Sequence, residues 1–180
     1  MIKEWNIDSS WSLFLDRDGV INERIWNGYV LNYEQFVFKA HSLVALKFLT
    51  HYFSYTIIVT NQQCVSKKLI TVKELDEIHD QMLTEITQFG GKINSVFAAT
   101  EHKGKTPFRR KPNNIMGLEA QEMFPRIDFT KTIMIGDTDS DIEFGKNLGM
   151  KTILLKSDEK NTIQADFEIS NLIELIDFIN

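Results

Sequence analysis

The sequence predicts a doubly wound α/β domain with a mainly parallel sheet and helices on both of its faces. Short apolar runs alternate with longer amphipathic stretches along the chain, and this alternation is typical of α/β folds. Runs such as "TIIV" and "TIMI" are apolar at every position. Strands that are buried on both faces of a sheet have this pattern.

Six segments are predicted to be strands, the last of them with the weakest pattern: residues 11–16, 55–61, 93–100, 131–137, 151–155 and 165–169. Helices are predicted over residues 40–51, 71–89, 113–124, 140–149 and 170–179. Thr71 and Glu74 form a capping-box pattern at the start of the second helix. Gly149 is a typical stop signal for the fourth.

Length and composition favour one soluble cytoplasmic domain over residues 1–180. The net charge of −5 argues against a dedicated nucleic-acid-binding protein, which usually carries a basic face. There is no apolar stretch of signal-peptide length at the start and no run of about 18 apolar residues, so no membrane association is expected. Cys64 is the only cysteine, which excludes an intrachain disulfide and multi-cysteine zinc sites. The oligomeric state is not predicted.

Residues with functional chemistry collect where predicted strands end. The groups are "DRDG" (16–19), "TNQ" (60–62), "RKP" (110–112) and "GDTDSD" (136–141). Each alone is explained by a helix cap, a turn or a solvated loop. In a parallel sheet, however, all four reach the carboxyl edge, which is where doubly wound sheets bind ligands. Their joint arrival at one edge therefore predicts a functional site.

The acidic residues of these groups predict a metal site. Asp16 and Asp18 are two residues apart in an extended segment, so their side chains point the same way. Asp137 adds a third carboxylate and Asp141 lies close behind. Carboxylates packed together without a cation repel one another. Oxygen ligands of this kind suit Mg²⁺, which also shares substrate phosphates.

Positive and flexible residues complete a predicted phosphate site. Lys111 can offset charge on phosphoryl oxygens, and Thr60 offers a hydroxyl. Gly19 allows a close approach of the backbone. A metal with preorganised donors around a phosphoryl group is the usual arrangement for phosphoryl transfer.

These residues resemble the haloacid dehalogenase superfamily of phosphatases, whose four motifs occur in order. They are "DRDGV" (16–20), Thr60, Lys111 and "GDTDSD" (136–141). Within it the chain is most similar to the D-glycero-D-manno-heptose-1,7-bisphosphate phosphatase and histidinol-phosphatase branch, through "FLDRDGVIN", "GYV", "VTNQ", "LIT" and "RKP". The resemblance covers nearly the whole chain and implies a three-layer Rossmann-like fold.

The resemblance implies a role for each acidic residue. Asp16 is the nucleophile that forms an aspartyl-phosphate. Asp18 protonates the leaving oxygen and then deprotonates water, which requires a pKa near the working pH. Mg²⁺ is held by Asp16, the backbone carbonyl of Asp18, and Asp137. Asp141 steadies the metal's water ligands or Lys111.

The resemblance also implies which residues bind the substrate. Thr60, Asn61 and Lys111 grip the transferring phosphate, and Arg110 reaches the rest of the molecule. The expected substrate is a small sugar phosphate or bisphosphate, with heptose bisphosphate as the best single candidate.

The chain departs from the branch in two places. Branch members often have a zinc loop built as Cys-x-His and Cys-x-Cys before Arg-Lys-Pro. Residues 100–112, "TEHKGKTPFRRKP", keep only His102, so no zinc is expected. Cys64 stands where the branch usually has glycine, and a packed small side chain is expected there rather than a catalytic thiol. The altered loop puts both named substrates in doubt.

No cap domain is expected, because residues 20–39 are long enough only for a flap. Five aromatic residues in the flap are expected to pin it to the core: Trp26, Tyr29, Tyr33, Phe36 and Phe38. A substrate rim or a subunit contact is the alternative for them. Which of the flap and the 101–111 loop sets specificity stays open.

Four alternatives to heptose bisphosphate remain. Two are a histidinol-phosphate phosphatase and a phosphatase of the octulosonate-8-phosphate type. The third is a nucleic-acid 3′-phosphatase, which the five basic residues within 103–111 would suit. The fourth is a catalytically silent phosphate-binding protein on the same fold.

Overall fold

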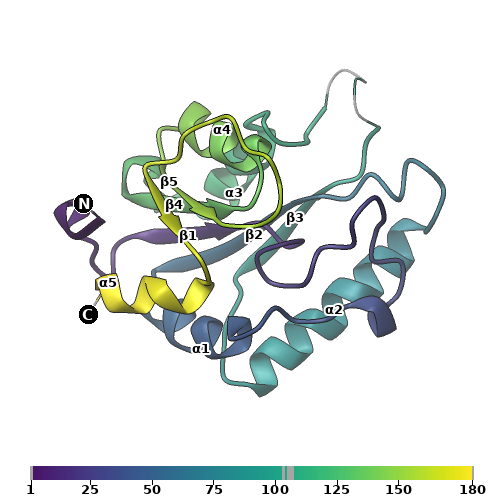
Figure 1. Ribbon diagram of the computed structural model, residues 1–180, viewed down its shortest axis with the longest axis horizontal. Coiled ribbons are helices and arrows are strands. Elements are labelled where there is room, and N and C mark those ends of the chain that lie inside the picture. The colour runs from purple at the N-terminus through teal and green to yellow at the C-terminus, as the bar shows by residue number, and fades with distance from the viewer. Residues whose placement is uncertain (1, 103, 105–107, 180) are drawn as a thin grey trace.

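The computed structural model describes residues 2–102, 104 and 108–179, and these form a three-layer α/β structure (Figure 1). The described residues contain six strands: β1 (Ser12–Leu15), β2 (Tyr55–Asn61), β3 (Ser95–Ala99), β4 (Thr132–Gly136), β5 (Lys151–Leu155) and β6 (Phe167–Ile169). They also contain five α-helices: α1 (Ser42–Tyr52), α2 (Val72–Gln88), α3 (Ile115–Met123), α4 (Asp139–Asn147) and α5 (Ile176–Ile179).

Four short 3₁₀ helices complete the described structure: Ile2–Trp5, Tyr33–Gln35, Phe129–Lys131 and Leu172–Leu175. The sequence pattern predicts one helix over 170–179, but its first turn is the 3₁₀ helix Leu172–Leu175, which α5 continues. Tighter turns of this kind are common at helix ends. The capping box of Thr71 and Glu74 is confirmed at the start of α2.

The six strands form one parallel sheet in the order β3-β2-β1-β4-β5-β6. The chain proceeds from β1 toward β2 and β3 on one side and returns to β4 on the other. The strand order therefore reverses at β1, and the crevice at the carboxyl ends of β1 and β4 is the expected ligand position. This confirms the predicted doubly wound sheet.

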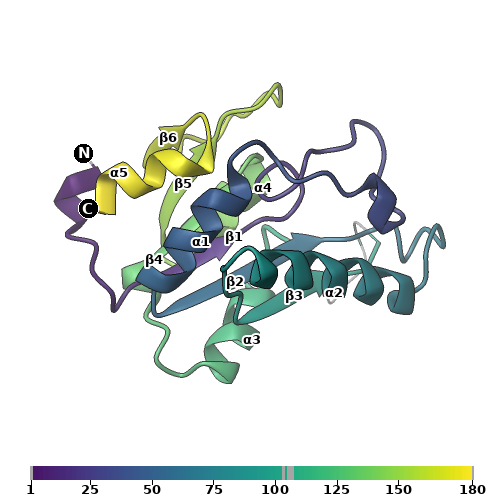
Figure 2. The same ribbon diagram turned by 90° about the horizontal axis from the view of Figure 1, so that it is seen from below.

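Helices α1, α2 and α5 cover one face of the sheet, and α3 and α4 cover the other (Figures 1 and 2). Each face has its own apolar core. Along β1, Leu13 and Leu15 belong to the core with α1 and α2, whereas Phe14 belongs to the core with α3 and α4. Successive side chains of a strand point to opposite faces, so a strand covered on both sides must be apolar throughout.

Within the described residues, the segments that leave the sheet are loops and sheet-covering helices, and no folded domain is inserted between them. The flap (residues 20–39) is held by short backbone bridges, including Glu23 N–H to Val37 O at 2.7 Å and Lys39 N–H to Ile21 O at 2.9 Å. No helix in the described part of the chain is both long enough and apolar enough to span a membrane.

Candidate active site

A pocket of about 680 Å³ opens at the carboxyl edge of the sheet, beneath the flap. Seven of the residues predicted from the sequence line it: Asp16, Asp18, Thr60, Asn61, Arg110, Lys111 and Asp141. Asp137 is fully buried behind the wall of this pocket. Four separate loops therefore converge on one edge, as the sequence predicts.

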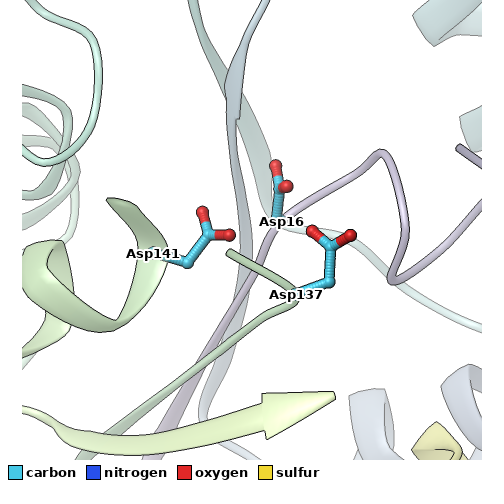
Figure 3. Close-up of side chains that lie close together, drawn as sticks. All are labelled: Asp16, Asp137 and Asp141. Carbon is cyan, nitrogen blue, oxygen red and sulfur yellow. The ribbon is translucent and has the colours of Figure 1, made fainter. Parts of the chain in front are cut away.

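Three carboxylates form an acidic cluster, defined as Asp16, Asp137 and Asp141. One oxygen from each lies within 4.8 Å of the other two. Figure 3 shows Asp16 at the end of β1, Asp137 just after β4, and Asp141 on α4. Burial and the neighbouring carboxylates raise the pKa of Asp16 to about 6, against the opposing effect of Lys111. The same two causes raise the pKa of Asp137 to about 7.

Lys111 provides the positive charge inside this cluster. Its ammonium group is almost fully buried and lies 2.8 Å from Asp16 Oδ1 and 2.6 Å from Asp141 Oδ1. It also donates a hydrogen bond of 2.6 Å to the carbonyl oxygen of Val59. Burial opposes the charge, but Asp141 and Asp16 outweigh it and raise the pKa of Lys111. The lysine is therefore a fixed cation between two of the three carboxylates.

The remaining carboxylate, Asp137, has an arrangement that fits a metal ligand. Its Oδ1 is buried and has no hydrogen-bond partner in the described structure. Its Oδ2 lies 3.2 Å from Arg24 Nη1 of the flap. Gly19 has φ +93°, and a Cβ there would lie 2.2 Å from Asp137 Oδ2. An unpartnered buried oxygen beside two more carboxylates fits a hard divalent cation such as Mg²⁺, and the raised pKa values of Asp16 and Asp137 agree with this.

Asp18 lies in a different environment, the Asp18 network, defined as Asp18, Arg17, Asn22, Gln62 and His79. Its Oδ1 accepts hydrogen bonds from Arg17 Nη2 (2.9 Å) and Asn22 Nδ2 (3.0 Å). Its Oδ2 accepts a hydrogen bond of 2.7 Å from Gln62 Nε2. Burial works against the negative charge, but Arg17 and the amide donors outweigh it and lower the pKa of Asp18.

This lowered pKa differs from the value near the working pH that an acid–base role requires. The difference arises because three donors stabilise the carboxylate of Asp18. A phosphate dianion bound beside the carboxylate adds negative charge and moves the pKa upward.

The two neutral residues predicted to hold phosphate lie at the end of β2. Asn61 exchanges hydrogen bonds with the backbone of Lys111: its Nδ2 donates to Lys111 O (3.2 Å), and Lys111 N–H donates to its Oδ1 (2.9 Å). Its side chain therefore fixes the loop that carries the lysine. The hydroxyl oxygen of Thr60 accepts a hydrogen bond of 2.8 Å from Gln62 Nε2.

The basic residues of the 101–111 loop lie in different environments. Arg110 lines the pocket, and its Nη1 is buried without a hydrogen-bond partner in the described structure. Arg109 forms an ion pair with Glu119 on α3, with 2.5 Å between Nη2 and Oε2. His102 is exposed. The other predicted basic positions, 103 and 105, lie outside the described residues, as do 106 and 107.

The flap aromatics are divided between the core and the pocket. Phe36 is buried, and Tyr29, Tyr33 and Phe38 pack against the core, as expected. Trp26 is the exception, because it is 50% exposed and lines the pocket. Cys64 is fully buried, and its Sγ lies 3.6 Å from Gln62 Oε1, in agreement with a packed side chain.

Sequence patterns did not reveal several residues of this site. Arg24 reaches Asp137 and Glu159, both at 3.2 Å. Lys67 lines the pocket, with its Nζ 5.0 Å from the centre of the Tyr29 ring. His79 is the one polar member of the buried face of α2. The polar side chain of His79 was the available signal in the sequence, because the inner face of an amphipathic helix is otherwise apolar.

The chain is similar in sequence to known hydrolases. The HAD-hydrolase-like family model matches residues 108–172. A D-glycero-alpha-D-manno-heptose-1,7-bisphosphate 7-phosphatase of Mycobacterium bovis is 33% identical over 77% of this chain and 73% of its own length. A D-glycero-beta-D-manno-heptose-1,7-bisphosphate 7-phosphatase of Helicobacter pylori is 28% identical over 96% of this chain and 99% of its own.

A solved structure has the same fold. It is the D,D-heptose 1,7-bisphosphate phosphatase of B. bronchiseptica complexed with magnesium and phosphate, with a TM-score of 0.83. It is 21% identical, and the match covers 93% of this chain and 96% of that one.

Proposed function

The chain belongs to the heptose-bisphosphate phosphatase family of the haloacid dehalogenase superfamily, and from this premise we propose that it is a Mg²⁺-dependent phosphomonoesterase that acts through Asp16. The observation that carries the proposal is the buried Lys111 ammonium between Asp16 and Asp141, beside the unpartnered oxygen of Asp137. Buried charges are costly unless they are paired. A site that groups them at the mouth of a pocket fits chemistry on a charged substrate.

The first step is attack by Asp16 on the phosphorus atom. A new bond forms between a carboxylate oxygen of Asp16 and phosphorus, and the bond from phosphorus to the leaving oxygen breaks. Asp18 gives its proton to that leaving oxygen. Lys111 offsets negative charge on the phosphoryl oxygens, and the hydroxyl of Thr60 donates a hydrogen bond to one of them.

The second step hydrolyses the aspartyl-phosphate. Asp18, now a carboxylate, takes a proton from a water molecule whose oxygen attacks phosphorus. The bond between phosphorus and Asp16 breaks, which regenerates the free carboxylate and releases inorganic phosphate. Arg17, Asn22 and Gln62 hold Asp18 in place for both proton transfers.

Asp16, Asp137 and the backbone carbonyl of Asp18 are the proposed Mg²⁺ ligands, with Asp141 supporting Lys111. When bound, Mg²⁺ offsets the charge of the carboxylates and of the phosphoryl oxygens. The raised pKa values of Asp16 and Asp137 support this assignment, because both carboxylates lack a full complement of positive charge.

The proposed substrate is D-glycero-D-manno-heptose 1,7-bisphosphate, the compound for which the relatives are named. A bisphosphate has a second phosphate that does not react. Besides Lys111, four cationic side chains line the pocket: Arg24, Lys67, Arg110 and Lys160. Arg24 is paired with Asp137 and Glu159, whereas Arg110 has an unpartnered buried nitrogen in the described structure. These side chains supply positive charge for the second phosphate. Their position in the pocket wall therefore favours a bisphosphate substrate over a monophosphate.

The test is phosphate release from a panel of esters, with Mg²⁺ and with a chelator. The panel holds both anomers of heptose 1,7-bisphosphate, histidinol phosphate, octulosonate 8-phosphate and a 3′-phosphorylated oligonucleotide. We expect Mg²⁺-dependent turnover with the highest kcat/KM for one heptose bisphosphate anomer. A preference for another ester would reassign the substrate, and no turnover of any ester would leave a silent phosphate-binding protein.

A further inference from the structure

Arg17 lies between the two catalytic aspartates in the chain, yet its side chain is fully buried. Its Nη2 donates to Asp18 Oδ1 at 2.9 Å, and its Nη1 lies 3.1 Å from His79 Nε2. Its Nε has no partner in the described structure. Among the described residues, therefore, hydrogen bonds from the guanidinium group reach only Asp18 and His79.

His79 meets the guanidinium as an acceptor. Arginine has only N–H donors, so a hydrogen bond between the two requires that His79 Nε2 carries no proton. The environment agrees, because burial and then the charge of Arg17 lower the pKa of His79 to about 3. The ring is therefore neutral, and its free electron pair faces Arg17.

We propose that His79 is a positioning residue: through Arg17, it holds the carboxylate of Asp18 in the orientation that proton transfer to the leaving oxygen requires. The inference rests on the proposed phosphatase function. It extends the site from the carboxyl edge of the sheet to the inner face of α2, a helix that contains none of the catalytic motifs.

The geometry explains why Asp18 needs this support. Asn22 and Gln62 also donate to its carboxylate, but Arg17 is the only charged donor of the three. Charge-assisted hydrogen bonds are the stronger kind. The Phe36 ring centre lies 5.9 Å from the guanidinium carbon and contributes no directional hydrogen bond. Without His79, the guanidinium would be oriented from the Asp18 side alone.

The consequence depends on the leaving group. A sugar alkoxide is a poor leaving group and needs a proton as the bond to phosphorus breaks. A p-nitrophenolate ion leaves without one. Loss of the orientation of Asp18 should therefore slow hydrolysis of sugar phosphates and spare p-nitrophenyl phosphate.

The test compares kcat/KM for both esters in His79→Leu and His79→Gln, because kcat/KM covers the steps up to departure of the leaving group and excludes the later hydrolysis of the aspartyl-phosphate, in which Asp18 also acts. Leu removes the acceptor at similar size, whereas the side-chain oxygen of Gln can still accept from Arg17. For His79→Leu we expect kcat/KM to fall at least about tenfold on the sugar phosphate and at most about threefold on p-nitrophenyl phosphate. His79→Gln should recover at least half of the lost rate.

Two further variants make the result specific. Asp18→Asn should show the same dependence on leaving group, but larger. Ile86→Ala is the matched control, because Ile86 is buried on the same helix and belongs to the apolar core. It should change both rates by the same factor. If His79→Leu does not fold, Arg17→Lys replaces it, because lysine keeps the charge but lacks the planar guanidinium whose two terminal nitrogens meet Asp18 and His79 separately.

A spectroscopic measurement separates failure of this inference from failure of the proposed function. Arginine side-chain NMR reports whether the guanidinium group of Arg17 is held. We expect hindered rotation in the wild type and in His79→Gln, and free rotation in His79→Leu. Unchanged rotation in His79→Leu, an equal loss of rate on both esters, or no recovery in His79→Gln would each overturn the inference. If the wild-type protein holds the guanidinium group of Arg17 but turns over no ester, only the proposed phosphatase function is overturned.

Discussion

The acidic cluster and the Asp18 network lie at one pocket, but they shift the pKa values of their carboxyl groups in opposite directions. In the acidic cluster, burial and mutual repulsion raise the pKa of Asp16 to about 6 and that of Asp137 to about 7. In the Asp18 network, Arg17 and two amide donors more than offset burial and lower the pKa of Asp18. Asp16 and Asp18 are only two residues apart, yet their pKa values shift in opposite directions. The partners around each carboxyl group therefore decide its charge state, and closeness in sequence does not.

The difference shows what each region lacks. In the Asp18 network, both carboxylate oxygens of Asp18 have a donor from the protein. The acidic cluster has three carboxylates and one lysine that contacts two of them, and the buried Oδ1 of Asp137 has no hydrogen-bond partner in the described structure. A region short of positive charge is suited to bind a cation, and a region with fixed donors is suited to hold one carboxyl group in place.

The largest expected effect comes from replacing Asp16, the proposed nucleophile. Asp16→Asn should lower kcat at least about 10⁴-fold on every ester, whatever its leaving group, because no aspartyl-phosphate can form. Steady-state phosphate release measures it. Asp80→Asn, an exposed aspartate on α2, is the control and should leave kcat unchanged. Residual activity close to the wild type would mean that Asp16 is not the nucleophile.

Removing the buried cation should break the acidic cluster. Lys111→Met leaves Asp16 and Asp141 facing each other, so we expect the free energy of unfolding to fall by about 3–5 kcal/mol in chelator. Mg²⁺ should restore part of this loss. Urea unfolding measures both, and Lys73→Met at an exposed site on α2 is the control. A loss as small as that of the control would show that Lys111 does not balance the cluster.

The pH dependence of stability should have opposite signs in the two regions. For Asp137 the folded pKa is raised, so the unfolded state ionises first, and stability in chelator falls as pH rises from 3.8 toward about 7. For Asp18 the folded pKa is lowered, so its contribution is present above the unfolded pKa and is lost as pH falls.

Thermal unfolding across this pH range, with chelator and with Mg²⁺, measures the first effect. Asp137→Asn should flatten the decline in chelator, and saturating Mg²⁺ should do the same for the wild type. Asp18→Asn should instead remove stability from the neutral side of the profile. An identical profile with and without Mg²⁺ would contradict a cation site at Asp137.

A smaller effect is expected from the flap. Arg24 competes with a cation for Asp137, since its Nη1 lies 3.2 Å from Asp137 Oδ2. Arg24→Gln should therefore tighten Mg²⁺ binding by about three- to tenfold, as measured by isothermal titration calorimetry. Arg126→Gln removes an exposed arginine that contacts Tyr55 and should leave the affinity unchanged. Weaker binding in Arg24→Gln would mean that the arginine supports the metal site.

The smallest effect should come from Cys64, which lies behind Gln62 in the Asp18 network. Its Sγ is a weak donor at 3.6 Å from Gln62 Oε1. Cys64→Ala should change kcat by less than about twofold and the unfolding free energy by about 1 kcal/mol. Loss of turnover comparable to that of Asp18→Asn would show that the thiol positions Gln62.

Much of the fold could be predicted because a parallel sheet has a strong local pattern. The predicted ranges 55–61 and 151–155 agree with β2 and β5 as observed. The other strands were predicted one to two residues too long at one or both ends. Three of the four 3₁₀ helices in the described residues, such as Tyr33–Gln35, were missed because three or four residues carry no helical periodicity.

The placement of the aspartates proposed to be catalytic was predictable for a different reason. Strand topology alone brings the ends of β1 and β4 together, and the motif residues sit at those ends. The contacts of Arg24 with Asp137 and of His79 with Arg17 were not predictable, since each joins separate elements across a long sequence separation. The environment of Asp18 was also missed, because its lowered pKa depends on Arg17, Asn22 and Gln62 meeting in space.

Asp141 is both a site residue and a helix-start residue. It accepts hydrogen bonds from the backbone N–H (3.0 Å) and the hydroxyl (2.6 Å) of Thr138 at the start of α4, while its other oxygen meets Lys111. Natural selection for a stable helix would therefore retain this aspartate in a descendant that had lost its activity. Asp16 has no such helix contact among the described residues, so in a distant relative it is Asp16, and not Asp141, whose presence distinguishes a working enzyme from an inherited fold.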